Sequence, residues 1–473
     1  MALKRHLASS AGTALLLLLL SGCGAAPVAL DTAAHHERVT SDRAIAERDA
    51  IHELTLRGAL ARGVEYNLDG RVAALETLST QKNISVEKLK AIPGIEASGG
   101  YKGRSNDGGT SSRSVITGQQ SLEPSQSTEQ HRRVASLNTT WNLLDTAIAL
   151  TEARSADDRA GIAQERYIKV VQNIERDVYA AYWRAWVHQE NHAANNHLIE
   201  RAAKQLSNIN QAVDENLISA DAAGEKVAQI SDRLRTLREM NEQLALADIE
   251  LKSLLSLPLE NPVKLAAPEG AENYRHILSE SMDELTWEAL LSRPEMREEI
   301  LQKNVAQRDV KMEVLRTLPG ADLFLGLNYD GNKFLSDSTW GDFSALVTQS
   351  LTSLLTVVAR RDAALKKEEV ADARRQALSA AILAQTWIAR QRLASGDEAY
   401  RDNIASGKAA QRRATVVTEK AGAGFTSGEG LVQSQIEAQI ETLRAAISQA
   451  ELQDSYAAMM NTLGRSLIAG GAS

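Results

Sequence analysis

The sequence contains two copies of one large unit. Leu68 aligns with Pro294 at an offset of 294 − 68 = 226. Pro93 aligns with Pro319 at the same offset, 319 − 93 = 226. A period this long excludes a solenoid of short repeats and predicts two copies of a large structural unit.

The offset becomes smaller in the second half of each copy. Residues 217–221 align with residues 425–429, at an offset of 429 − 221 = 208. The difference, 226 − 208 = 18, means that one connection is shorter in the second copy. Because the offset changes between Pro93 and Ser136, we expect the shorter connection to be a loop between two strands.

The first residues have the form of a secretory signal. A basic segment at 4–6 precedes an apolar run at 11–20 that is too short to span a bilayer comfortably. The run ends at Leu20-Ser21-Gly22-Cys23, which resembles a bacterial lipobox. We therefore predict a lipoprotein signal peptide at 1–22.

Cys23 would become the lipid-modified N-terminus of a tether at 23–40, which shows no helical or strand periodicity. Gly24 after the cysteine favours delivery to the outer membrane in lipoproteins. The alternative is an ordinary signal followed by an incidental cysteine. Cys23 is the only cysteine of the chain, so the sequence offers no disulfide framework and no cysteine metal site.

Composition excludes several classes of protein. The net charge of −8, with positive and negative residues interspersed, argues against a nucleic-acid partner. No stretch after the signal approaches 18 consecutive apolar residues, so we expect no transmembrane helix. Abundant alanine, leucine, glutamate, arginine and glutamine are typical of long helices.

The first repeat, which we place at 41–257, changes its hydrophobic period twice. A helical pattern runs from Leu54 to about Leu89, and alternating polarity then predicts a β-hairpin at about 95–143. A helical stripe follows for about 70 residues, which would make a helix of roughly 105 Å. We expect two antiparallel, coiled-coil-like helices with a turn near 214–223.

The second repeat, at 285–465, has the same plan. A proline-containing linker at 258–284 separates it from the first repeat, and a tail at 466–473 follows it. We expect its β-hairpin at about 321–351 and its helical-hairpin turn near 421–430.

Four strands per chain impose a physical constraint. They are too few to close a barrel, and an open sheet edge is not tolerated in hydrocarbon because its backbone groups are unpaired. Membrane barrels begin at about eight strands, so we expect several chains to pool their strands. The long helices, pooled around the same axis, would extend the barrel as a hollow cylinder, which is a duct.

Several short motifs carry a family resemblance. They are Leu54-Thr55-Leu56 with Asn67-Leu68, Arg293-Pro294-Glu295-Met296-Arg297, Pro93 and Pro319 before strands, the segment 136–143 with Asp145, and Gly424-Phe425-Thr426-Ser427 before Glu429-Gly430-Leu431. In this order, duplicated and after a lipobox, they resemble the TolC-like outer-membrane factors, which are exit channels of tripartite efflux and type I secretion systems. The first turn departs from the family pattern, because Glu215-Asn216 replaces a small residue or glycine.

The resemblance implies a fold and partners. The fold class is mostly α with a small β part: long helices form a periplasmic α-barrel, and a trimer shares a transmembrane β-barrel of twelve strands. The implied partners are two further copies, a periplasmic adaptor, an inner-membrane transporter and outer-membrane lipid. The alternative is a periplasmic coiled-coil lipoprotein that scaffolds the envelope without a pore.

The resemblance also implies roles for the two helical turns. Asp221 and Glu429 match an acidic position that lines the closed periplasmic mouth, and three copies of each would form cation-selective rings. The alternative role is to favour the start of a helix. The adaptor would pack on tip residues, although packing within the trimer explains them too; these residues are Leu217, Ile218, Ser219, Phe425, Thr426, Ser427 and Leu431.

Other candidate sites are weaker. His188 and His192 lie one helical turn apart but lack an evident third metal ligand, so we expect solvated or pore-facing histidines. Trp141 fits either an aromatic belt at the membrane surface or a strand core. No nucleophile, base or carboxylate pair stands out, so we expect no enzymatic activity and no cofactor.

Overall fold

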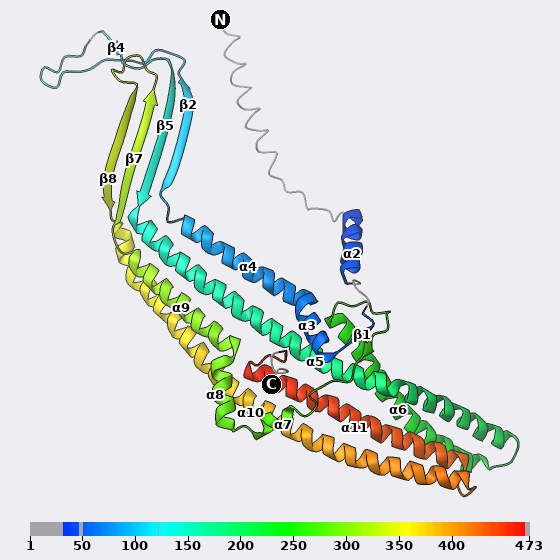
Figure 1. Cartoon of the computed structure of the whole chain (residues 1–473). Helices are drawn as coiled ribbons and strands as arrows, with labels where there is room; N and C mark the ends of the chain where they lie inside the picture. The colour runs from blue at the N-terminus through cyan, green and yellow to red at the C-terminus, as the bar shows by residue number, and fades with distance from the viewer. Residues whose placement is uncertain (1–31, 47–50, 122, 469–473) are drawn as a thin grey trace.

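The computed structural model describes residues 32–46, 51–121 and 123–468. The molecule is elongated, with a four-stranded sheet at one end, two helical hairpins at the other and a mixed region between them (Figure 1). The signal peptide and Cys23 lie outside the described residues. Helix α2 (Thr32–Ala46) lies in and beyond the segment where the sequence predicted an irregular tether.

The structural elements repeat at the offsets seen in the sequence. Helix α3 (Leu56–Tyr66) has its counterpart in α8 (Met282–Ser292), at 282 − 56 = 226. The other pairs are α4 (Leu68–Leu89) with α9 (Pro294–Leu315), β2 (Gly94–Gly103) with β7 (Gly320–Asp330), β5 (His131–Asn142) with β8 (Thr339–Thr348), α5 (Leu143–Asp214) with α10 (Leu351–Gly422), and α6 (Ala220–Leu254) with α11 (Gly428–Leu463). From α5 onward the offset is 208, as in 351 − 143.

The shorter connection lies between the strands. In the first repeat the segment 104–130 joins β2 to β5 and contains the short strands β3 (Gly109–Thr110) and β4 (Ser125–Gln126). In the second repeat residues 331–338 make the same connection. The first repeat therefore carries a long loop at the end of the sheet that is farthest from the helices (Figure 1).

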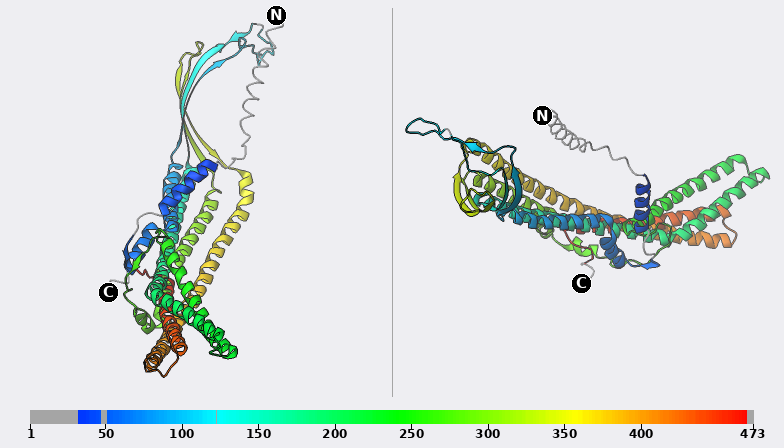
Figure 2. Two further views of the ribbon diagram at one scale, coloured as in Figure 1. Left: turned by 90° about the vertical axis from the view of Figure 1, so that its right-hand side faces the viewer. Right: turned by 90° about the horizontal axis from the view of Figure 1, so that it is seen from above.

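The four long strands form one antiparallel sheet in the order β2-β5-β7-β8. Its register places Ile95 opposite Thr139, Thr139 opposite Leu325, and Leu325 opposite Phe343. The strands curve together where they leave the helices (Figure 2). Only one side of β2 and one side of β8 is paired among the described residues, so the sheet has two open edges.

The long helices pack as the sheet order requires. Helix α4 packs on α5, α5 on α9, and α9 on α10, so these four continue the row of strands. Beyond the middle of the molecule α5 pairs with α6, and α10 pairs with α11 (Figure 1). The apolar stripes predicted for these helices are buried at Ile174, Val178, Ile230, Leu234, Ile436 and Ile440.

The mixed region joins the two repeats. Strand β1 (Glu53–Leu54) pairs in parallel with β6 (Lys264–Leu265), and the short helix α7 (Tyr274–Ser279) follows. The hydroxyl of Tyr182 lies 2.8 Å from the carbonyl oxygen of Leu54 and 2.7 Å from that of Ala266. The segment predicted as a linker thus contains β6, α7 and the start of α8.

The predicted fold class is confirmed, because the chain is mostly helical with a small strand part. None of the described helices combines the length and the apolar character needed to cross a membrane.

Candidate functional site

One face of the four-stranded sheet is apolar. Because side chains alternate between faces along a strand, the register places a set of apolar residues together. They are Ile95, Leu137, Trp141, Leu323, Leu325, Leu327, Tyr329 and Phe343, and all are exposed in the single chain. Phe343 has 80% of its surface exposed. A contiguous exposed apolar surface of this kind marks a contact with a membrane or a protein.

The opposite face is mainly polar. Ser98 and Ser136 share a hydrogen bond of 2.8 Å, and Asn142 donates to the Asp322 carboxylate at 2.7 Å. Asp342 accepts hydrogen bonds from Asn328 at 2.7 Å and from the indole of Trp340 at 3.1 Å. Phe324 and Leu346 also lie on this face, so polarity alternates less regularly in the second repeat.

Both ends of the row of elements are uncovered. Helix α4, which leads into the open edge strand β2, exposes Val72, Leu75, Val86 and Leu89. At the other end α10 exposes Leu351, Leu355 and Val358 below the open strand β8. Each side of the row thus presents unpaired strand backbone together with an apolar helical surface. Such surfaces are suited to contact with another chain.

The turns of the two helical hairpins have one structure. Asn216 and Gly424 occupy equivalent positions and have left-handed backbones, with φ of 57° and 81°. The next amide hydrogen-bonds back across the helix end in each turn, from Leu217 to Ala212 and from Phe425 to Lys420, both at 2.8 Å. Asparagine tolerates the left-handed region better than most residues, which explains how the first turn departs from glycine without changing shape.

The residues after each turn begin the next helix. Ser219 and Ser427 are the N-caps of α6 and α11, and their hydroxyls accept hydrogen bonds from Ala222 and Gly430 at 3.3 Å. Asp221 and Glu429 are the second residues of these helices, where the helix dipole favours an acid. The helical role considered for both acids is therefore compatible with their positions.

The two acids have different surroundings. Glu429 forms an ion pair with Lys226 at 2.8 Å and so links α11 to α6. Asp221 is exposed, and none of the described residues forms an ion pair or a side-chain hydrogen bond with it. Both acids lie at the far tip of the molecule, but of the two only Glu429 has an ion-pair partner among the described residues.

The predicted docking residues divide into exposed and packed groups. Leu217 and Phe425 have 70% and 84% of their surface exposed, and Ser219 and Ser427 are also exposed. The remaining three, Ile218, Thr426 and Leu431, are half-buried, and Ile218 packs against the main core.

A polar seam between α6 and α11 was not predicted. Beyond Lys226 and Glu429, Gln433 donates to Gln229 at 3.3 Å. Further along, Arg233 lies 3.8 Å from Glu437. On each helix these polar residues recur at helical spacing, and this spacing could be seen in the sequence. That the two sets contact each other follows only from the packing of the two repeats side by side.

Three other residues that the sequence singled out have local partners. The rings of His188 and His192 lie 4.9 Å apart, and His192 shares a 3.0 Å hydrogen bond with Asn196. No group of three potential ligands that could hold a metal ion occurs among the described residues. Trp141 donates to Thr146 at 2.7 Å where β5 continues into α5.

The fold is that of known outer-membrane channels. The CmeC channel of Campylobacter jejuni superposes with a TM-score of 0.66 and 13% identity, over 86% of this chain and 85% of that one. The open state of the MtrE channel of Neisseria gonorrhoeae has a TM-score of 0.63 and 15% identity, over 87% of this chain and 89% of that one. VceC, an outer-membrane protein of Vibrio cholerae, has a TM-score of 0.64 and 11% identity, over 87% of this chain and 96% of that one.

No protein-family model and no curated protein matches the chain. At identities of 11–15% the structures establish shape rather than activity. The resemblance to the TolC-like outer-membrane factors is therefore confirmed at the level of the fold: this chain has the fold of an outer-membrane channel protomer.

Proposed function

We propose that the protein is the outer-membrane exit duct of a tripartite efflux or type I secretion system. The observation that carries this proposal is the sheet, which has an exposed apolar face, a polar face and two open edges. With lipid on the apolar side and water on the polar side, closure into a barrel would satisfy both the side chains and the edges.

Closure requires further copies of the chain, and we propose three. Three copies supply twelve strands, with β8 of one copy beside β2 of the next. In the same ring, the apolar stripes of α10 and α4 would cover each other. The helices would then continue the barrel as a tunnel into the periplasm.

The far tips would meet the partners. We propose that Leu217 and Phe425 pack against a periplasmic adaptor, together with their neighbours Ile218, Ser219, Thr426, Ser427 and Leu431. The adaptor would connect the duct to an inner-membrane transporter, which supplies the energy. The exposure of two large apolar side chains at the tips supports this proposal.

Asp221 and Glu429 are proposed to gate the periplasmic mouth. Rings of three carboxylates would favour cations, and the Lys226–Glu429 ion pair would hold α6 to α11 within each copy. The lipid on Cys23 would anchor the duct in the outer membrane.

The second candidate function is a scaffold without a pore. Its support is the length of the helical hairpins, which would span a wide gap. A scaffold gives no reason for a sheet whose exposed apolar face contains Phe343, Ile95 and Leu327. We therefore favour the duct.

Single-channel conductance in a planar bilayer tests this proposal. We expect steady, cation-selective current steps from the detergent-solubilised protein, and weaker cation selectivity in the D221N and E429Q variants. A matched control is E272Q, which removes a carboxylate from the exposed loop before α7. A silent bilayer, despite inserted and folded protein, would contradict the duct and favour the scaffold.

A further inference from the structure

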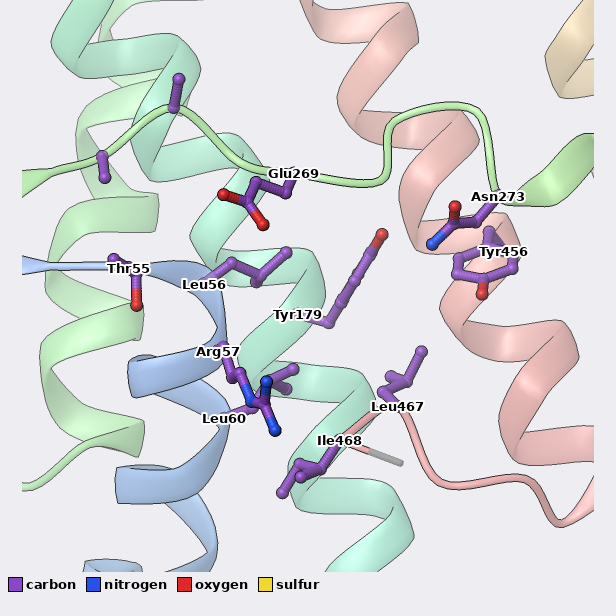
Figure 3. Close-up of a pocket in the computed structure, with 12 residues that line it drawn as sticks. Thr55, Leu56, Arg57, Leu60, Tyr179, Glu269, Asn273, Tyr456, Leu467 and Ile468 are labelled. Atoms are coloured by element: carbon purple, nitrogen blue, oxygen red, sulfur yellow. The ribbon is translucent and has the colours of Figure 1, made fainter. Parts of the chain in front are cut away.

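A cavity lies where the two repeats meet. It has a volume of about 360 Å³, within the range of small-molecule sites. Five segments form its walls: the start of α3, the middle of α5, the segment between β6 and α7, the end of α11, and the residues that follow α11 (Figure 3). These segments are far apart in the sequence, so the cavity exists only in the folded chain.

Apolar side chains make up more of the cavity lining than polar ones do. Leu56, Leu60, Leu467 and Ile468 contribute aliphatic side chains. Tyr179 and Tyr456 are nearly buried, and their rings lie 5.9 Å apart. Burial raises the pKa of both phenols, so both remain neutral. The cavity therefore favours an apolar body.

Two opposite charges face the cavity from different walls. The Arg57 side chain comes from the start of α3, and the Glu269 side chain comes from the segment before α7 (Figure 3). Both side chains are exposed, and neither forms an ion pair with any other described residue. Nearby exposed charges do pair, as between Glu272 and Arg275 at 2.9 Å. Arg57 and Glu269 are thus an anion-binding group and a cation-binding group that have no ion-pair partner in the part of the chain that the structure describes.

We propose that this cavity binds a short apolar peptide with free ends. The peptide carboxylate would pair with the Arg57 guanidinium, and its ammonium group would pair with the Glu269 carboxylate. The apolar side chains would lie against Leu56, Leu60 and Leu467. A short peptide carries its two charges at opposite ends of an apolar body, and the cavity likewise carries its two charges on different walls. The proposal does not depend on the duct function.

The binding of such a peptide would reinforce the junction of the repeats. The C-terminal wall of the cavity is already held to other elements, because Leu467 donates its amide to Glu175 at 2.7 Å. Arg465 forms ion pairs with Glu288 at 2.5 Å and Glu280 at 3.0 Å. A ligand between this wall and α3 would add a further link and raise the temperature of unfolding.

Isothermal titration of the full-length protein in detergent tests the proposal, with leucyl-leucine as the probe. We expect R57Q and E269Q each to weaken binding about tenfold, since each removes a charged hydrogen-bonding partner. R71Q and E272Q are matched controls, because they neutralise exposed charges that do not line the cavity. They should leave the Kd unchanged.

Probes with one end blocked test which end of the peptide each charged residue binds. Blocking the amino group as N-acetyl-leucyl-leucine should weaken binding to the wild type but have little further effect on E269Q. Leucyl-leucinamide, which lacks the carboxylate, should bind the wild type more weakly but show little further loss with R57Q. Absence of binding by the wild type, or equal losses in the control variants, would overturn the proposal. A silent bilayer with intact peptide binding would contradict only the duct.

Discussion

The two repeats make the same bend with different chemistry. Asn67 lies between α3 and α4, and Arg293 lies at the equivalent position between α8 and α9, at 293 − 67 = 226. Their backbones are nearly identical, with φ and ψ of −64° and 129° for Asn67 and −67° and 131° for Arg293. Both side chains are buried. The two repeats thus share the backbone path at this bend but differ in the side-chain interactions that stabilise it.

The first repeat stabilises the bend locally. The Asn67 side chain accepts hydrogen bonds from the amides of Asp69 and Gly70, at 3.0 and 3.2 Å, and so caps α4. Its amide group donates to the carbonyl of Leu254 at 3.2 Å. All of these contacts are neutral and involve the backbone.

The second repeat uses proline and a charge network. Pro294 suits the first helical position and restricts the preceding residue to an extended conformation, so no side-chain cap is needed. The Arg293 guanidinium is free to bind Glu295 at 2.9 Å and Gln385 at 2.6 Å. Glu295 also pairs with Lys169 at 3.0 Å. This bend therefore connects α5, α9 and α10 and depends on charge.

The largest difference is expected from the R293M variant. Methionine keeps much of the volume but removes the buried Arg293 charge from its pair with the half-buried Glu295, so we expect the free energy of unfolding to fall by about 3 kcal/mol. Thermal or urea unfolding in detergent measures this. The R297M control removes the exposed Arg297 from its pair with Glu165 and should cost at most about 1 kcal/mol. Equal losses would mean that the network adds nothing to the bend.

Acid should weaken the second bend selectively. Burial by itself would raise the pKa of Glu295, but hydrogen bonds from Arg293 and the charge of Lys169 outweigh it and lower the pKa to about 2. The stability that charged Glu295 contributes is fully present above pH 4.5, the ordinary pKa of a glutamate, and is lost as the pH falls toward 2. We expect the stability difference between wild type and E295Q to shrink over this range. A difference that does not change with pH would contradict this explanation.

The N67A variant should have a smaller effect. Losing the cap of α4 is expected to cost about 1 kcal/mol, which is less than the loss of Arg293. The N67D variant keeps an acceptor for the helix amides and loses the donor to Leu254, so its stability should lie between those of N67A and the wild type. If N67A cost more than R293M, the contrast between a local and a networked bend would be wrong.

The smallest effects should come from exchanging the turn residues. At Gly424, the G424N variant should change stability by only a few tenths of a kcal/mol, because asparagine already occupies the same left-handed conformation at position 216. The G424A variant should cost about 1 kcal/mol. An added Cβ at Gly424 meets nothing within 4 Å, so this cost is one of backbone conformation alone. Equal effects of the two substitutions would contradict the equivalence of the turns.

Much of this fold could be predicted from local pattern. The change from period two to helical period predicted the strands and long helices, because side-chain direction in each element depends on its own backbone. The constant offsets predicted equivalent elements in both repeats. The helical period did not reveal the break at Asn67, since a helical stripe continues across it, although Asn67-Leu68 and Arg293-Pro294 stand among the motifs of the family resemblance. Helix α2 was missed because its segment has weak amphipathicity.

The candidate site was only partly predictable. The tip residues could be placed because they follow a recognisable turn, and the two faces of the sheet follow from alternation. The partners of Glu429 and the polar seam could not be predicted, because they join helices that are about 200 residues apart in the chain.

The sequence by itself determined the duplication, the type of each long element and the polarity of each strand face, since these depend on neighbours within a few residues. Tertiary structure decided which charges meet and where a cavity forms. Lys226 meets Glu429, and Arg57 faces the cavity that Glu269 also lines, only because the two repeats pack side by side. Contacts of this kind depend on the distance between elements in space, which the order of residues does not specify.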